Sequence, residues 1–179
     1  MHVEISSLPG LAKAIKRCHP GYIISVTDPN SPESLQAKSI LATAPCLYAR
    51  LNFHDIDVPA PGYRMPSKDI IASVLVMIDR INPGERPLLI QCNAGISRSP
   101  AVALLAQCHV AMQDDSFTPG DARHLVRALD GAFGPISPNP AVMQIGEELL
   151  GNHGKAMREE AGLLDRTRLS IPVDSSSIF

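Results

Sequence analysis

Blocks of apolar residues separated by polar turns run along the first half of the chain, and they predict short strands that alternate with helices. Three β-branched runs that end in turn-forming residues predict strands: VEISS (3–7), YIISV (22–26) and LLIQC (88–92). The segment APCLYARLNF (44–53) predicts a fourth. Three segments combine proline with other turn residues and predict loops: TDPNSP (27–32), IDVPAPGYRMP (56–66) and NPGERP (82–87).

Apolar residues spaced three and four positions apart predict helices elsewhere. This spacing covers residues 8–17. It also follows Ser67, an expected N-cap, and its apolar positions there are Ile70, Ile71, Val74, Leu75, Ile78 and Ile81.

Three more helices are predicted in the second half of the chain. Residues 99–112 are apolar nearly all round, which is typical of a helix packed inside a domain. Thr118, followed by Pro119 at the first helical position, predicts the start of the next helix. Asn139, again before a proline, predicts the start of the last one, which is expected to run to Gly151.

Strands that alternate with helices are typical of an α/β domain in which helices flank a central, mostly parallel sheet. The length of 179 residues suits one domain with room for a full core. We therefore expect a single domain over residues 1–164, followed by a flexible polar tail over 165–179.

The composition argues against several kinds of function. Apolar residues make up 45% of the chain and charged residues 19%, and the formal net charge of -2 gives no basic surface for nucleic acid. No apolar run reaches the roughly 18 residues that a membrane helix needs, and the N-terminus lacks the basic and apolar regions of a secretory signal. We expect a cytoplasmic protein without nucleic-acid or membrane partners, and the sequence makes no prediction of its oligomeric state.

The four cysteines predict reduced thiols, because they are widely spaced in a chain too long to need disulfide stapling. They are Cys18, Cys46, Cys92 and Cys108. A zinc site would need a C-x2-C pair or clustered histidines, and the sequence has neither. Cys108 is most simply a core residue of its helix, and the spacing gives no support for a disulfide between Cys92 and Cys18 or Cys46.

The segment IQCNAGISRSPA (90–101) places a thiol and a guanidinium in one short turn. A strand is expected to end at Cys92, and a helix to begin near Arg98 or Ser99. The turn between them can aim successive backbone N–H groups at one point, and the helix N-terminus adds positive potential. Because Arg98 can add a two-pronged contact to an oxyanion, the segment predicts a phosphate-sized anion site with a sulfur at its floor.

Such a site suggests a chemical role for Cys92. The donors that hold an anion also stabilise a thiolate, and a thiolate beneath a phosphate is placed for in-line attack on phosphorus. The hydroxyl of Ser99 could then assist departure of the sulfur. An isolated cysteine is more often a small buried hydrophobic residue, but the arginine spacing, Gly95 and Ser99 together favour the chemical role.

The motif CNAGISRS resembles the C-x5-R signature loop of cysteine-dependent phosphatases, and its A-G-x-S-R-S form is most similar to the dual-specificity subgroup. SPNPAVMQIGEELL (137–150) resembles the Pro-Asn segment that begins a late helix in that subgroup, and LNFHDI with the long downstream helix resembles small bacterial members. The resemblance covers residues 1–155. It implies a protein-tyrosine-phosphatase-like fold and hydrolysis of phosphomonoesters through a phosphocysteine intermediate.

The resemblance also implies a role for each residue of the loop. Cys92 would be the nucleophile, Arg98 would bind the phosphate and the transition state, and Ser99 would assist thiolate release. The backbone would hold the remaining phosphate oxygens at Asn93, Ala94, Gly95, Ile96 and Ser97.

Gln91 departs from the family pattern, which has a histidine immediately before the cysteine. Glutamine can donate a hydrogen bond through its amide but carries no charge. We therefore expect weaker stabilisation of the thiolate and reduced activity. The alternative is a phosphatase-like module that binds phosphorylated partners without turning them over.

Cleavage of a phosphate ester also needs a proton for the leaving oxygen, which the family takes from an aspartate about three dozen residues before the cysteine. Asp55 and Asp57 are the candidates, and Asp55 is favoured because it lies at the strand end and matches the Asp-Ile of similar bacterial sequences. His54 beside it is assigned a packing role. The proline-rich loop that follows could be a semi-rigid wall of the pocket or a moving lid.

The uncharged loop sequence NAGIS argues against highly anionic phosphoinositide headgroups and favours a phosphorylated protein or a small phosphomonoester. Arginine and backbone amides supply the electrostatic stabilisation, so we expect no metal or other cofactor. Arg123 and Arg127, four positions apart, are expected on a solvated helix face. Arsenate reductases and rhodanese-type sulfurtransferases, which also use cysteine and oxyanion loops, are the remaining alternatives.

Overall fold

The computed structural model describes residues 1–81 and 86–169. Within them, four strands form one parallel sheet in the order β1-β4-β2-β3. The strands are β1 (Val3–Ser7), β2 (Tyr22–Thr27), β3 (Leu47–Asn52) and β4 (Leu88–Cys92). The helices are α1 (Leu11–Cys18), α2 (Pro32–Leu41), α3 (Lys68–Arg80), α4 (Arg98–Ala111), α5 (Pro119–Phe133) and α6 (Pro140–Leu169). The predicted α/β class, with helices around a parallel sheet, is confirmed.

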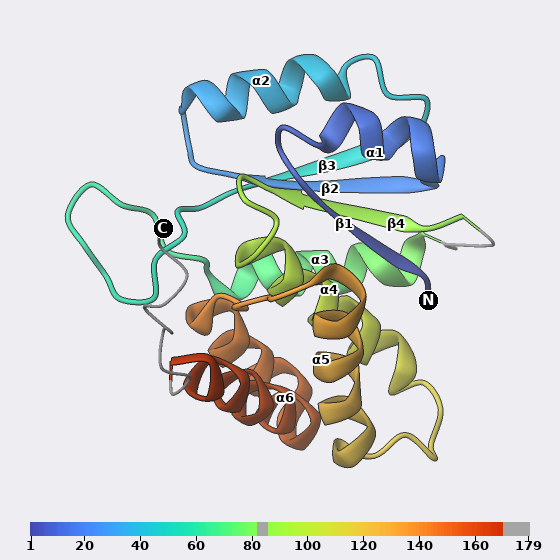
Figure 1. Ribbon diagram of the computed structural model, residues 1–179, viewed down its shortest axis with the longest axis vertical. Coiled ribbons are helices and arrows are strands. Elements are labelled where there is room, and N and C mark those ends of the chain that lie inside the picture. Colours follow the sequence, from blue (N-terminus) through green and yellow to red (C-terminus); the bar gives the residue numbers. More distant parts are fainter. Residues whose placement is uncertain (82–85, 170–179) are drawn as a thin grey trace, which may run out of the picture.

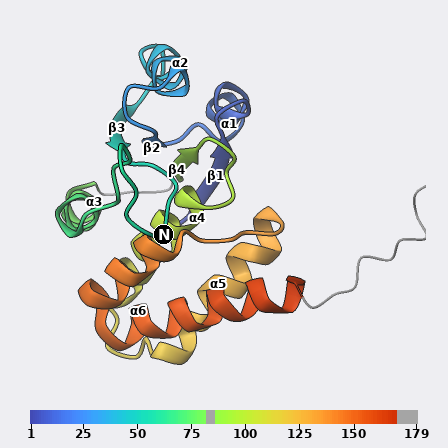
Figure 2. The same ribbon diagram turned by 90° about the vertical axis from the view of Figure 1, so that its left-hand side faces the viewer.

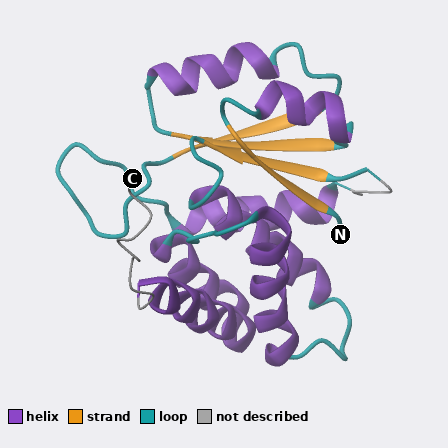
Figure 3. Cartoon of the chain, in the orientation of Figure 1, coloured by secondary structure: helices purple, strands orange, loops and turns teal. Residues whose placement is uncertain are grey.

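The helices cover both faces of the sheet. α1 and α2 lie on one face, and α3 to α6 lie on the other (Figure 1, Figure 3). The smaller core, beneath α1 and α2, includes Leu11, Ile23 and Leu89, while the larger core contains most of α4. Every residue of β4 is buried, because this strand lies between β1 and β2 and under helices on both faces.

Side-chain caps set the starts of two predicted helices. The Ser67 hydroxyl accepts a hydrogen bond from the backbone N–H of Ile70 at 3.3 Å, at the start of α3. Thr118 and Asp121 form a reciprocal capping box at the start of α5, in which each side chain accepts from the backbone N–H of the other residue. Both predicted starts are confirmed.

Helix α2 has no counterpart among the predicted elements. Its first residue, Pro32, lies in the segment TDPNSP, which predicts a loop. The Ser31 hydroxyl caps the helix by accepting from the N–H of Ser34 at 3.0 Å. Few apolar residues mark its inner face, where Ala37 and Leu41 are buried with Ser34, so the hydrophobic spacing is too weak to show the helix.

Helix α6 bends back on itself instead of ending at Gly151. At this glycine φ is 58° and ψ is -130°, and the chain then continues as helix to Leu169 (Figure 2). The first half (140–150) and the second half (152–169) approach so closely that a Cβ at Gly154 would lie 2.3 Å from the carbonyl oxygen of Gly146. Residues 165–169, expected as tail, are therefore helical, and the rest of the expected tail, 170–179, lies outside the described residues.

The sheet topology brings distant segments to one edge. In a parallel sheet all carboxyl ends of the strands lie together, and ligand sites of α/β proteins form there. Here that edge receives Asp28 after β2, Asp55 after β3 and the segment 92–98 after β4. In the part of the chain that the structure covers, no helix is long and apolar enough to cross a membrane.

Candidate active site

The segment 92–98, called the signature loop below, connects β4 to α4 and packs tightly against the end of β1. Gly95 has a φ of 79°, and a Cβ at this position would lie 3.0 Å from the backbone nitrogen of Ser7. The N–H of Leu8 donates to the carbonyl of Asn93 at 3.0 Å. Glycine is therefore needed at position 95 for both the left-handed backbone and the close approach.

Cys92 lies at the floor of this loop, with 1% of its surface exposed. Its Sγ is 3.1 Å from the Oγ of Ser99 and accepts a hydrogen bond from the N–H of Gly95 at 3.2 Å. Ser99 is fully buried on the first turn of α4. The sulfur is thus held between a backbone donor of the loop and a side chain of α4.

The backbone of the loop offers further donors. The N–H groups of Ala94, Ile96 and Ser97 have no acceptor among the residues that the structure describes. Helix α4 begins at Arg98, so its positive end lies at the same place. The predicted strand, loop and helix around Cys92 are thus present, with unpaired donors available to an anion.

Arg98 is 2% exposed and is held by two oxygen atoms from neighbouring strand ends. Its Nη1 donates to Oδ1 of Asp28 at 2.5 Å and to the carbonyl of Phe53 at 2.7 Å. Its Nε lies 3.7 Å from Oδ2 of Asp55 and makes no hydrogen bond to a described residue. A buried donor without a partner costs about 1–3 kcal/mol, so this nitrogen is suited to a bound oxyanion.

Asp55 lies against the signature loop. Its Oδ1 accepts from the Ser97 hydroxyl at 2.6 Å and from Nδ2 of Asn139 at 2.9 Å. Its side chain is 37% exposed, so the carboxyl group can reach a ligand in the loop. Asp57, the other candidate acid, lines a separate pocket next to α6.

The segment before α6 fixes the far side of the loop. The N–H of Ser137 donates to the carbonyl of Ile96 at 2.9 Å, and the N–H of Asn139 donates to the carbonyl of Ser97 at 3.2 Å. Asn139 is buried and also caps α6, because its Oδ1 accepts from the N–H of Val142 at 3.0 Å. One side chain thereby joins the start of α6 to both Asp55 and the signature loop.

Gln91, which precedes the cysteine, is completely buried. Its Oε1 accepts from the hydroxyl of Ser25, the neighbouring residue on β2, at 2.7 Å. Its Nε2 has no partner among the described residues. The position next to Cys92 therefore holds an uncharged amide whose two N–H donors make no hydrogen bond to a described residue.

His54 closes the base of the proline-rich loop. Its backbone N–H donates to the carbonyl of Arg64 at 2.8 Å, and its ring Nδ1 accepts from the backbone N–H of Arg64 at 2.7 Å. Its ring also meets that of Tyr63 edge-on at 4.9 Å. These contacts agree with the packing role expected for His54, and they favour a wall over a moving lid.

Arg123 and Arg127 are both exposed, as expected, and each also pairs with a glutamate of α6. Arg123 pairs with Glu159 at 2.9 Å. Arg127 donates from its Nε to Glu160, a buried carboxylate, at 2.7 Å. Both arginines therefore join α5 to α6, and neither supports the signature loop.

The remaining cysteines are structural. Cys108 is fully buried in the larger core, and burial raises the pKa of its thiol to about 12. Cys18 and Cys46 pack against the smaller core, and burial raises the pKa of each thiol above its usual value. All four cysteines are free thiols.

Sequence reasoning does not assign three residues to the site. They are Asp28, which accepts a hydrogen bond from Arg98, Asn139, which donates to Asp55, and Ser25, which donates to Gln91. Asp28 could have been found, because it directly follows a strand expected to end at the same edge of the sheet. Asn139 is predicted only as a helix start, within a segment that resembles one of the family, and nothing in its spacing indicates a contact with Asp55. Within the described residues, no group of three or more histidine, cysteine, aspartate or glutamate side chains could hold a metal ion.

Neither a family model nor a curated protein matches the sequence. Solved structures do match the fold. DUSP15 aligns with a TM-score of 0.56 and 17% identity, over 89% of each chain. OH1 of Orf virus, a tyrosine phosphatase with triple substrate specificity, aligns with a TM-score of 0.56 and 13% identity, over 83% of this chain and 82% of its own.

A further match carries a different description. A human tyrosine phosphatase-like serine/threonine/tyrosine-interacting protein aligns with a TM-score of 0.54 and 18% identity, over 81% of this chain and 88% of its own. Identities this low establish the fold and no more. The chain has the fold of the dual-specificity and protein-tyrosine phosphatases.

Proposed function

We propose that this protein hydrolyses phosphomonoesters, as a protein-tyrosine or dual-specificity phosphatase, through a phosphocysteine at Cys92. One observation carries the proposal: the Cys92 sulfur, held by Ser99 and the Gly95 N–H, lies in the same loop as the buried Nε of Arg98, which makes no hydrogen bond to a described residue. The fold shared with DUSP15 and OH1 supports it. The substrate would be a phosphorylated protein or a small phosphomonoester.

In the first step, the Cys92 thiolate attacks phosphorus, the S–P bond forms, and the bond to the ester oxygen breaks. Arg98 and the free N–H groups of the loop stabilise the charge on the phosphate oxygens. Asp55 gives its proton to the leaving oxygen.

In the second step, water attacks phosphorus, the S–P bond breaks, and Asp55 takes a proton from the water. The Ser99 hydroxyl, 3.1 Å from the sulfur, donates a hydrogen bond to the departing thiolate. Inorganic phosphate then leaves. Together the two steps return Cys92 and Asp55 to their starting states, and they require no metal ion.

A second candidate function is phosphate recognition without turnover, and the uncharged Gln91 favours it. Its amide adds no positive charge beside Cys92, and its Oε1 is already engaged by Ser25. In that case the loop would hold the phosphorylated residue of a partner while the thiol remains a poor nucleophile. The two functions differ in turnover but share the anion site.

Hydrolysis of p-nitrophenyl phosphate from pH 5 to 8, with a metal chelator present, tests the proposal. We expect turnover by the natural chain and none by Cys92→Ser. The matched control is Cys46→Ser, which removes a thiol far from the loop and is expected to retain turnover.

The outcomes separate the two functions. If the natural chain gives no turnover but vanadate or phosphate still protects Cys92 from alkylation, the protein binds phosphate without cleaving it. Gln91→His is then expected to restore turnover. Turnover that persists in Cys92→Ser would overturn the cysteine mechanism.

A further inference from the structure

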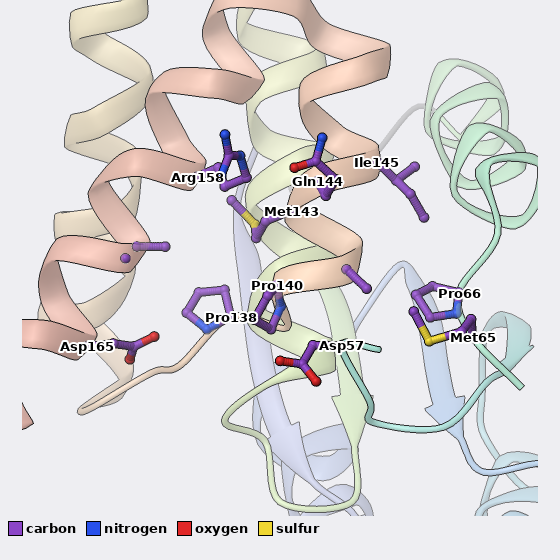
Figure 4. A pocket seen from close by; sticks show the side chains of 13 residues that line it. Asp57, Met65, Pro66, Pro138, Pro140, Met143, Gln144, Ile145, Arg158 and Asp165 are labelled. Atoms are coloured by element: carbon purple, nitrogen blue, oxygen red, sulfur yellow. The ribbon is translucent and has the colours of Figure 1, made fainter. Parts of the chain in front are cut away.

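A pocket of about 550 Å³, called the side pocket below, lies in the angle between the two halves of α6 (Figure 4). The proline-rich loop closes one side with Asp57 and Pro66. The first half of α6 supplies Pro140 and Met143, and the second half supplies Arg158 and Asp165. The bend at Gly151 therefore creates this pocket.

The side pocket adjoins the signature loop. Pro138 and Pro140 line it, and Asn139 between them contacts both Asp55 and the carbonyl of Ser97. Asp57 is two residues from Asp55, and consecutive Cα atoms are about 3.8 Å apart. A chain whose phosphorylated residue occupies the loop can thus place a neighbouring side chain in the side pocket.

The charge of the side pocket favours a cation. Asp57 and Asp165 lie on different sides of it (Figure 4), and neither has an ion-pair partner among the described side chains. The one cation of the lining, Arg158, donates to Glu147 at 2.6 Å, so its charge is balanced. Carboxylates at both sides and methionine and proline between them suit the aliphatic stem and charged head of lysine or arginine.

We propose that the side pocket binds a lysine or arginine side chain close to the phosphorylated residue, so that this protein selects phosphoproteins with a basic residue beside the phosphorylation site. This inference rests on the proposed phosphate site of the signature loop. An acidic side chain next to the phosphorylated residue would find a partner in the side pocket only if Arg158 left Glu147. It would still face Asp57 and Asp165.

The test measures the binding of fluorescein-labelled nine-residue phosphotyrosine and phosphothreonine peptides to the full-length Cys92→Ser protein. Lysine, glutamine or glutamate is placed in turn at each flanking position of an alanine background. At one position we expect lysine to bind about fivefold more tightly than glutamine, a typical gain for a partly exposed ion pair. Glutamate should bind more weakly than glutamine there.

Variants in the same Cys92→Ser background assign the preference. Asp57→Asn and Asp165→Asn should each reduce the lysine-to-glutamine affinity ratio toward one. Asp115→Asn makes the same charge change on the exposed connection between α4 and α5 and should leave the ratio unchanged. Equal affinities at every position, a preference for glutamate, or a lysine preference that survives both pocket variants would overturn the inference.

Turnover of p-nitrophenyl phosphate by the natural chain, measured in parallel, keeps the two proposals apart. Turnover without any lysine preference overturns the side-pocket inference alone. A lysine preference without turnover supports the side pocket and overturns hydrolysis. Absence of phosphopeptide binding overturns the inference, whatever the turnover shows.

Discussion

The signature loop and the side pocket lie next to each other but are built differently. The loop supplies its reacting groups from seven consecutive residues, and contacts within this segment hold the sulfur, such as the Gly95 N–H on Cys92. The side pocket combines the proline-rich loop with two segments of α6 that meet only because the helix bends at Gly151. Chemistry is thus concentrated in a local motif, whereas the surface for substrate recognition depends on long-range packing.

The largest expected effect of a substitution lies in the loop, at Arg98→Lys. Lysine keeps the positive charge but carries all its donors on one nitrogen, so an ammonium that donates to Asp28 and Phe53 cannot also place an N–H at the position of Nε. We expect kcat/KM for p-nitrophenyl phosphate to fall by about 10³-fold, comparable with the loss of an oxyanion donor.

Arg123→Lys is the matched control, because Arg123 is an exposed arginine of α5 that pairs with Glu159 of α6 and does not support the signature loop. Its kcat/KM should stay within about twofold of the natural value, and thermal melting should show both variants folded. A folded Arg98→Lys variant with nearly full activity would contradict the role of Arg98.

Asp55→Asn tests the boundary between the two regions, since Asp55 contacts the loop and Asp57 lines the side pocket. Asparagine can still accept from Ser97 but cannot give a proton. We expect kcat to fall about 10²-fold for phenyl phosphate. The fall should be smaller for p-nitrophenyl phosphate, because its leaving oxygen depends less on receiving a proton.

Asp57→Asn distinguishes the two aspartates. It should leave kcat for phenyl phosphate near the natural value, because Asp57 lines the side pocket and makes no contact with the signature loop in the contacts that the structure describes. A loss of kcat in Asp57→Asn as large as that in Asp55→Asn would make Asp57 the acid and place the chemistry partly in the side pocket.

Sequence reasoning succeeds where structure is local. The apolar run that ends at Cys92, the glycine in the turn and the arginine six positions later predict the strand, loop and helix that the structure contains. Caps at Ser67 and Thr118 are also local signals. Asn139 contacts the site through helix packing, which one-dimensional spacing does not encode. Asp28 could be placed only by reasoning from the expected parallel sheet to the edge where its strands end.

Helix α6 shows the same limit. A glycine followed by polar residues indicates a helix end, and Gly151 does leave the helical conformation. The chain nevertheless continues as helix, because Gly154 allows its second half to pack against the backbone of Gly146 and Glu147 in the first half. The expected tail from residue 165 thus begins within a helix that also supplies Asp165 to the side pocket.

Gly154→Ala tests this packing. The added methyl group would lie 2.3 Å from the Gly146 carbonyl oxygen and 2.7 Å from Cα of Glu147, and backbone atoms cannot easily move away. We expect the free energy of unfolding in urea to fall by about 2–3 kcal/mol.

Gly131→Ala on α5 is the matched control, because no heavy atom lies within 4 Å of a Cβ added there. It should leave stability unchanged or raise it by up to about 1 kcal/mol, since alanine is the better helix former. Equal effects of the two substitutions would mean that the close approach within α6 contributes nothing to stability.

The smallest expected effect is a difference in alkylation between two thiols, Cys92 in the signature loop and Cys108 in the larger core. Cys92 and Cys108 are both almost inaccessible, but burial alone acts on Cys108 and raises its pKa to about 12 from 9.0. Iodoacetamide near pH 7.5 should therefore modify Cys92 before Cys108, and vanadate should protect Cys92. Peptide mapping by mass spectrometry should show Cys108 unmodified in the native protein at every pH from 6 to 8.5.

The sign of the pH effect follows from the same shift. The folded protein keeps the Cys108 proton at a pH where the unfolded chain loses it, so this burial stabilises the fold fully below about pH 9 and progressively less toward pH 12. Cys108→Ala should therefore make the loss of stability above pH 9 shallower. If Cys108 instead reacts as fast as the half-buried Cys18 and Cys46, the core beneath α4 opens too readily to hold the signature loop rigid.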